Sequence, residues 1–137
     1  MNLNDLPGEV LTSLRRGVVI PALPLALDKN RRLDERRQRA LLRYYFDAGA
    51  GGVAVGVHTT QFEIRLPMYN LYAPLLEIAR EEFDRFAEAT RKPVIRIAGA
   101  IGKTGQAVAE AERAAGSGFH AVLLSLAAFR NASNDKV

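Results

Sequence analysis

Apolar residues are gathered in four nearly continuous runs along this chain, each rich in valine, isoleucine, leucine or alanine. The runs are residues 17–26, 51–57, 92–100 and 119–127. Runs of this kind are typical of strands covered on both faces, as in a parallel sheet. Pro21 and Pro24 interrupt the first run and remove backbone N–H donors from it. The pattern therefore predicts four buried strands, the first of them suited to a sheet edge.

Three intervening segments carry their apolar residues three or four places apart, which predicts helices with one buried face. The segments are residues 33–49, 69–91 and 104–116. Gly49 marks the end of the first helix, and Thr104 is placed to cap the start of the third. Glu35 and Arg39 stand one turn apart in the first helix and are expected to form an ion pair.

Two segments repeat the same local plan. "AGAGGVAV" (48–55) and "AGSGFHAV" (115–122) each end a helix at a glycine, place a second glycine two residues later, and open a strand. Strands joined by single helices form parallel sheets with right-handed crossovers, which leaves an open doubly wound sheet or a TIM-type barrel as the candidates. Four such units, the last without its helix, amount to about half of a barrel of about 250 residues.

Composition narrows the class of protein without naming a function. The chain has 137 residues, 48% of them hydrophobic, with a formal net charge of +4 and no cysteine. We expect one partial α/β-barrel domain over residues 1–137, with 1–16 as an N-terminal leader and 127–137 as a tail. Without cysteine there is no disulfide or thiolate chemistry, and no run predicts a membrane span or secretion signal. A cytoplasmic location is the expectation.

Two motifs suggest nucleotide or nucleic-acid binding, but each has a simpler structural interpretation. A phosphate-binding loop before "GKT" (102–104) needs a glycine five places before Gly102, where Ile97 stands instead. The arginine-dense segment 30–43 fits a solvated helix face better than a nucleic-acid surface, because no aromatic residues alternate with its arginines. We therefore expect no nucleic-acid partner, no cofactor and no metal, and keep nucleotide binding through 102–104 as a remote alternative.

Three longer stretches carry a resemblance to a known family. They are "GVVIPALPLALDKNRRLD" (17–34), "FDAGAGGVAVGVHTTQFE" (46–63) and "KPVIRIAGAIGKTGQAVAEAERAAGSGFHAVLL" (92–124). Together they resemble the N-terminal half of the dihydrodipicolinate synthase and N-acetylneuraminate lyase family, which are Schiff-base aldolases. The resemblance implies a partial TIM (β/α)8 barrel of about four parallel units. It also implies lyase chemistry on a pyruvate-like 2-oxo acid.

The resemblance assigns a binding role to the segment after the second run. The family's paired threonines, which hold the carboxylate of the 2-oxo acid, match Thr59 and Thr60. His58 stands where the family usually has glycine, and it is either a pocket residue or a bystander in the loop. Gln61 and Phe62 replace a Gly-Glu pair, so the shape of the pocket differs from the family pattern.

The resemblance to this family assigns no catalytic residue in the chain. Phe129 falls at the position of the family's catalytic tyrosine and has no hydroxyl to relay a proton. The family's imine lysine lies on the sixth strand, beyond residue 137. Among the lysines present, only Lys103 is expected on the catalytic face, as a solvated loop residue, and His120 is expected to be structural. The three remaining lysines, which fall in turns or the tail, are Lys29, Lys92 and Lys136.

Two functions follow as expectations. The first is a dihydrodipicolinate synthase-family aldolase or lyase, inactive as this chain stands because the imine lysine is missing. The alternative is a non-catalytic half-barrel fragment that acts as a binding or assembly module. The apolar edge at residues 121–126 contains neither proline nor charge, so we also expect self-association.

Overall fold

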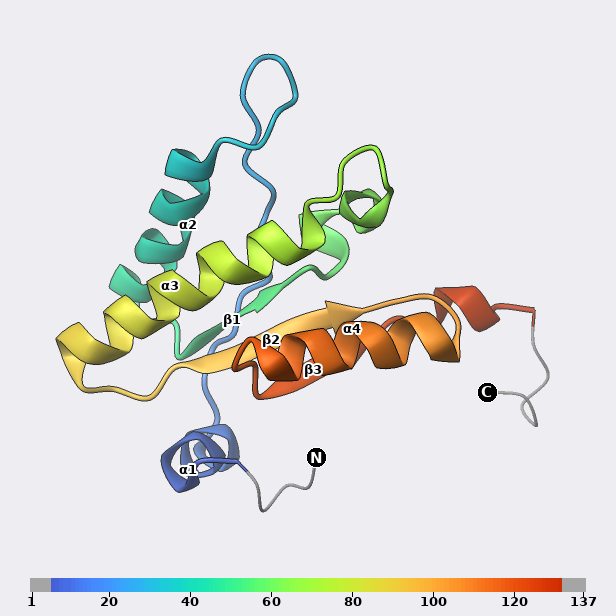
Figure 1. The fold of residues 1–137 in the computed structure, drawn as a ribbon. Helices are drawn as coiled ribbons and strands as arrows, with labels where there is room; N and C mark the ends of the chain where they lie inside the picture. Colours follow the sequence, from blue (N-terminus) through green and yellow to red (C-terminus); the bar gives the residue numbers. More distant parts are fainter. Residues whose placement is uncertain (1–5, 132–137) are drawn as a thin grey trace.

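The computed structural model describes residues 6–131. Helices and strands alternate along the chain after a first short helix (Figure 1). The elements are α1 (Gly8–Arg16), α2 (Glu35–Asp47), β1 (Gly52–Val55), α3 (Tyr72–Thr90), β2 (Ile95–Ala100), α4 (Thr104–Gly116) and β3 (Ala121–Leu124), with short 3-10 helices η2 (His58–Thr60), η3 (Phe62–Arg65) and η4 (Leu126–Phe129). The predicted leader thus contains a helix, α1, that the apolar pattern did not indicate.

The three strands form one parallel sheet in the order β1-β2-β3. Gly52 pairs with Ile95 at the start of the first ladder, and Ile97 pairs with Ala121 at the start of the second. The sequential order and the parallel direction agree with the prediction from the repeated glycine plan. All three strands therefore end at the same edge of the sheet, where the loops after them gather (Figure 1).

The prediction of four strands is corrected to three. Residues 17–26 are extended and lie beside β1, but they contribute only one isolated parallel bridge, between Ala22 and Ala54. Around it, the Leu23 N–H donates to the carbonyl of Ala54 at 2.8 Å, and the Ala54 N–H donates to the carbonyl of Pro21 at 2.9 Å. Pro21 and Pro24 have no N–H to donate, so the ladder cannot extend into a strand.

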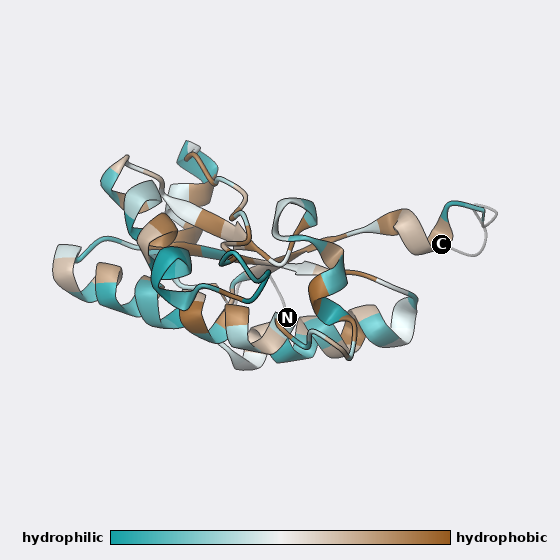
Figure 2. Ribbon diagram, turned by 90° about the horizontal axis from the view of Figure 1, so that it is seen from above, coloured by the Kyte–Doolittle hydropathy of each residue, from teal (hydrophilic) through white to brown (hydrophobic). Residues whose placement is uncertain are grey.

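Helices α2 and α3 cover one face of the sheet and supply most of the core. Four phenylalanines from three parts of the chain meet there. Phe46 stacks on Phe86 with ring centroids 4.4 Å apart, and Phe83 contacts both Phe46 and Phe119 edge to face at 5.8 Å. Figure 2 shows apolar strands between helices that carry both polar and apolar segments. The predicted helical stripes are confirmed in outline, because their central residues are buried.

Charged residues join α2 to α3. The Asp34 side chain caps α2, and the predicted pair of Glu35 and Arg39 forms at 2.7 Å. Glu82 of α3 is only 3% exposed, yet it accepts hydrogen bonds from Arg43 at 2.8 Å and from Arg39 at 3.3 Å. The hydrogen bonds from Arg43 are the main reason that the pKa of Glu82 is lowered from its ordinary value. The ion pairs thus offset the cost of burying this carboxylate.

Two glycines lie where strands or loops approach closely. A Cβ at Gly52 would stand 2.2 Å from the carbonyl oxygen of Ile95, its partner in β2. A Cβ at Gly99 would stand 2.3 Å from the carbonyl oxygen of Gly56, in the loop after β1. Only glycine fits at these two positions without moving the backbone.

Helix α4 begins and ends at the predicted residues, but its cap differs. Thr104 is the first residue of the helix, the N-cap position belongs to Lys103, and no side chain caps the helix. The loop between β2 and α4 is only residues 101–103, which agrees with the interpretation that "GKT" opens a helix directly.

Candidate functional site

The loops at the carboxyl edge of the sheet hold the residues that the sequence singled out. Residues 56–71 follow β1, residues 101–103 follow β2, and η4 follows β3. Barrels of parallel strands place their reacting groups at this edge, because loop side chains can converge there without disturbing the core. The candidate site therefore begins with the loop that follows β1, residues 56–71.

Thr59 and Thr60 lie side by side in η2 but have different surroundings. Thr60 is fully buried, and its hydroxyl donates to the carbonyl of Leu23 at 2.7 Å while accepting from the backbone N–H of Gly56 at 3.0 Å. It therefore ties the loop after β1 to the first extended segment. Thr59 is exposed at the surface of the same turn. The structure thus leaves the hydroxyl of Thr59 open to a ligand, whereas that of Thr60 already bonds within the chain.

His58 and Gln61 flank the two threonines. His58 is exposed, and its ring meets Phe62 edge to face with centroids 5.7 Å apart. Gln61 has φ 75° and ψ 129°, a backbone conformation that side chains other than glycine rarely adopt. Holding glutamine in this region costs on the order of 1–3 kcal/mol. This is the position where the resembled family carries glycine, so the backbone turn is kept while the residue has changed.

A buried ion pair beneath this loop was not predicted. Arg65 of η3 donates through Nε to both carboxylate oxygens of Glu110 in α4, each at 2.9 Å, and both side chains are at least 90% buried. Nη2 of Arg65 and the hydroxyl of Tyr72 both donate to the carbonyl of Gly99, at 3.0 and 2.7 Å. The guanidinium also lies 4.1 Å from the centre of the Tyr72 ring. Burial raises the pKa of Tyr72 to about 12, so its hydroxyl stays protonated as a donor.

Glu110 receives further support from its own side of the site. Gln106 donates to it at 2.9 Å and the backbone N–H of Ile101 donates at 3.2 Å. The cluster thus joins the loop after β1, the end of β2 and the start of α4 into one unit. Arg65 and Glu110 stand 45 residues apart, and no local spacing pattern links residues at that separation. The one available signal was a glutamate on an otherwise alanine-rich helix face.

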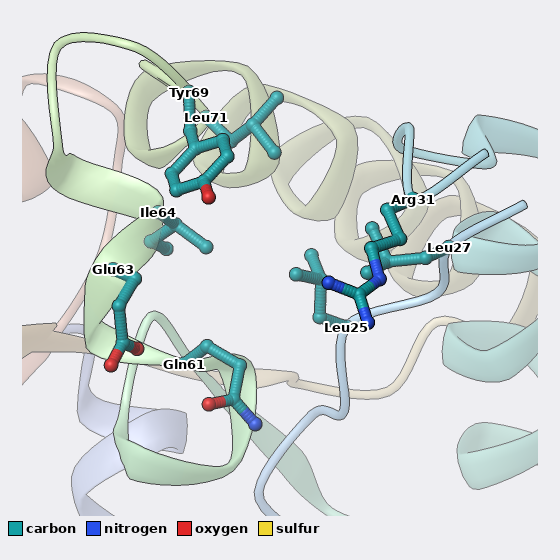
Figure 3. A pocket seen from close by; sticks show the side chains of 8 residues that line it. All are labelled: Leu25, Leu27, Arg31, Gln61, Glu63, Ile64, Tyr69 and Leu71. Atoms are coloured by element: carbon teal, nitrogen blue, oxygen red, sulfur yellow. The ribbon is translucent and has the colours of Figure 1, made fainter.

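An open cavity lies on the outer side of the same loop, facing the segment after Leu25 (Figure 3). Its apolar lining comes from Leu25, Leu27, Ile64 and Leu71, and its polar lining from Arg31, Gln61, Glu63 and Tyr69. Its volume is about 240 Å³. Sequence patterns did not predict this cavity, because its two walls come from segments at least thirty residues apart.

Comparisons with known proteins give a structural relationship. No protein-family model matches the sequence, and no curated protein matches it. Among solved structures, dihydrodipicolinate synthase DapA-2 from Bacillus anthracis is similar at a TM-score of 0.63 and 25% identity, over 79% of this chain and 34% of that one. Dihydrodipicolinate synthase from Bacillus clausii is similar at a TM-score of 0.57 and 17% identity, over 82% of this chain and 36% of that one.

The chain folds like the N-terminal part of a dihydrodipicolinate synthase. The resemblance seen in the sequence is thereby confirmed as a structural similarity. The matched part of this chain corresponds to about a third of the length of these synthases and lies in their N-terminal half.

The structure also shows where the other residues singled out in the sequence lie. Lys103 is exposed at the N-cap of α4, as expected of a solvated loop residue. Phe129 is half-buried at the end of η4. His120 lies at the opposite edge, where its Nδ1 accepts the backbone N–H of Arg96 at 3.2 Å, which is a structural contact. Lys29 and Lys92 are exposed. The structure does not describe residues 132–137, which include Lys136.

Two further features are absent from the described residues. Within residues 6–131, no three histidine, aspartate or glutamate side chains come together as metal ligands. Over the same residues, none of the helices combines the length and the apolar character that crossing a membrane requires.

Proposed function

We propose that this chain supplies the carboxylate-binding part of a 2-oxo-acid aldolase or lyase site of the dihydrodipicolinate synthase type. The observation that carries the proposal is the position of Thr59. It follows the first strand of a sheet that resembles those synthases, at the carboxyl edge, with an exposed hydroxyl.

The turn that carries Thr59 is held in place for this role. Thr60 fixes the turn through its hydrogen bonds to Leu23 and Gly56, so Thr59 does not need to be ordered when a ligand arrives. The backbone N–H groups of His58 and Thr59 donate to no other residue in 6–131. A hydroxyl and two neighbouring N–H groups are suitable donors for a carboxylate, because hydrogen bonds to a charged acceptor are the stronger kind.

A second candidate is the non-catalytic module, and one observation favours it. All the lysines in the described part of the chain, Lys29, Lys92 and Lys103, are exposed. A lysine that forms an imine needs surroundings that lower its pKa, and an exposed ammonium lacks them. In this candidate the chain binds a small acid or a partner without transforming it.

Binding of pyruvate tests the proposed site directly. In a ¹H–¹⁵N NMR titration, pyruvate should shift the signals of residues 56–60 first. Thr59→Val removes one donor to a charged acceptor and should weaken binding about tenfold. Thr104→Val, at an exposed threonine of the same edge, is the matched control and should bind as the parent chain does. Equal affinities of the two variants for pyruvate would show that Thr59 does not bind it.

Trapping with borohydride separates binding from catalysis. With pyruvate and borohydride, the chain should gain no covalent adduct by mass spectrometry, because its described lysines are exposed. A stoichiometric adduct on Lys103 would contradict this and would make the chain an aldolase-type enzyme in its own right.

A further inference from the structure

We propose that the cavity between residues 25–31 and 61–71 binds a small monocarboxylate with an apolar chain. This site does not include His58, Thr59 or Thr60, so it does not depend on the proposed function. Its two walls are the loop after the first extended segment and the loop that carries η3 (Figure 3).

The floor of the cavity suits an aliphatic chain. Ile64 is buried in the core, Leu25 and Leu71 pack against the core, and Leu27 is 39% exposed. A volume of about 240 Å³ has room for about eight non-hydrogen atoms at the packing of liquid water. Small-molecule sites commonly combine an apolar lining with a few polar groups that fix orientation, and this cavity has that composition.

Arg31 provides the positive end of the site. Its loop is rigid, because the Asp28 carboxylate accepts the backbone N–H groups of Asn30 and Arg32 at 2.8 and 2.9 Å, and Asp28 accepts that of Arg31 through its carbonyl at 3.0 Å. Arg31 takes a left-handed conformation at φ 61°. The guanidinium extends from this turn toward the cavity (Figure 3) and forms no ion pair or hydrogen bond with another residue in 6–131. A carboxylate is its natural partner, since the guanidinium fork matches it.

The opposite wall sets the charge of the ligand. The Tyr69 hydroxyl and the Gln61 amide turn toward the space between the loops, and the Glu63 carboxylate lies at its edge (Figure 3). These three side chains also form no hydrogen bond with any other residue that the structure describes. Glu63 repels a second negative charge, so one carboxylate on Arg31 is accommodated and a dicarboxylate is disfavoured. The charges therefore select a monoanion, and the floor selects an apolar chain.

Three six-carbon probes separate these requirements. Hexanoate, added to the whole chain in a ¹H–¹⁵N NMR titration, should shift residues 25–31 and 61–71. Hexan-1-ol keeps the chain without the charge, and adipate adds a second carboxylate; each should bind about tenfold more weakly than hexanoate. Pyruvate should not compete with hexanoate. Equal affinities for hexanoate and hexan-1-ol, or shifts outside the two loops, would overturn the proposal.

Matched variants then test the residues. Arg31→Gln should weaken hexanoate binding about tenfold, whereas Arg32→Gln, which removes the same charge from the next exposed residue, should change it less than about twofold. Leu27→Gln should weaken hexanoate and hexan-1-ol alike. Glu63→Gln should raise the affinity for adipate toward that for hexanoate, which tests the site even if Arg31→Gln disturbs its loop. An adipate affinity unchanged by Glu63→Gln would overturn the proposed selection of a monoanion.

Discussion

Strands β1 and β3 have the same length and contain no polar side chain, yet they have opposite surroundings. All four residues of β1 are buried, and all four residues of β3 are exposed. Leu123 and Leu124 expose 54% and 51% of their surface, while Val53 and Val55 expose none. Hydropathy alone therefore does not determine burial in this sheet; the neighbours of a strand do.

The neighbours of the two strands explain the difference. β1 lies between β2 and the first extended segment, and α2 and α3 pack over it. β3 has β2 on one side only, and no other described segment pairs with its outer edge. An apolar edge with free backbone groups is a template for another strand. We propose that the chain associates with itself and that β3 is the surface through which it does so.

Placing a charge in each strand should give the largest difference. Val55→Asp buries a carboxylate with no partner and should cost more than about 4 kcal/mol, enough to unfold much of the protein. Val122→Asp makes the same change in β3, where the side chain is 38% exposed, and should cost about 1 kcal/mol or less. Urea unfolding followed by circular dichroism measures both. Similar unfolding midpoints for Val55→Asp and Val122→Asp would show that β1 and β3 do not differ in burial.

Association through β3 should respond to a single lysine. Apolar burial contributes about 25 cal/mol per Å², so pairing the exposed edge stabilises a dimer or larger assembly by several kcal/mol. Leu124→Lys should shift sedimentation velocity profiles toward monomer. Val108→Lys, at a half-exposed valine of α4 away from the strand edge, should leave the profile of the parent chain unchanged. A parent chain that sediments as a folded monomer at micromolar concentration would rule out this role for β3.

The ion pairs of Glu82, which join α2 to α3 over β1, should make the fold less stable in acid. The folded state lowers the pKa of Glu82 below its ordinary value of 4.5, so its contribution is complete above that pH and is lost as the pH falls below it. Glu82→Gln should cost about 2 kcal/mol near neutral pH, and this cost should decrease as the pH falls below 4.5. Glu88→Gln, at an exposed position of the same helix, is the control. A Glu82→Gln cost that does not change with pH would contradict the role of its charge.

The smallest expected effect on stability is at His120, which is half-buried and immediately precedes β3. Burial lowers the pKa of His120 from its ordinary value of 6.5, with a smaller contribution from the charge of Arg96. The neutral ring is favoured in the folded state, so stability is complete above pH 6.5 and decreases as the pH falls below it, by less than about 1 kcal/mol. An NMR titration of the His120 ring protons should give a pKa below 6.5. A value of 6.5 or above would contradict this effect of burial.

The sequence predicted the elements that local patterns control. Helix α4 has the predicted bounds, and β1 and β2 fall inside the predicted apolar runs. Residues 17–26 were predicted as a strand because they are apolar. Pro21 and Pro24 limit this segment to a single bridge with β1. Helix α1 was missed because its apolar residues are few.

The candidate site was predictable only in part. The resemblance placed Thr59 and Thr60 after the first strand, but could not show that Thr60 bonds to a carbonyl 37 residues away. The pair of Arg65 and Glu110 depends on the packing of two loops, which no local spacing encodes. Whether Thr59 and Thr60 bind a 2-oxo acid stays a prediction.

The two tightly packed glycines have a consequence for how the sheet can change. If β2 slipped by one residue along β1, Ala98 or Ala100 would take the place of Gly99, and its Cβ would collide with the carbonyl oxygen of Gly56 2.3 Å away. The alignment of the first two strands is therefore fixed from both ends. A strand that joined the free edge of β3 would therefore meet a sheet whose first two strands cannot shift to accommodate it.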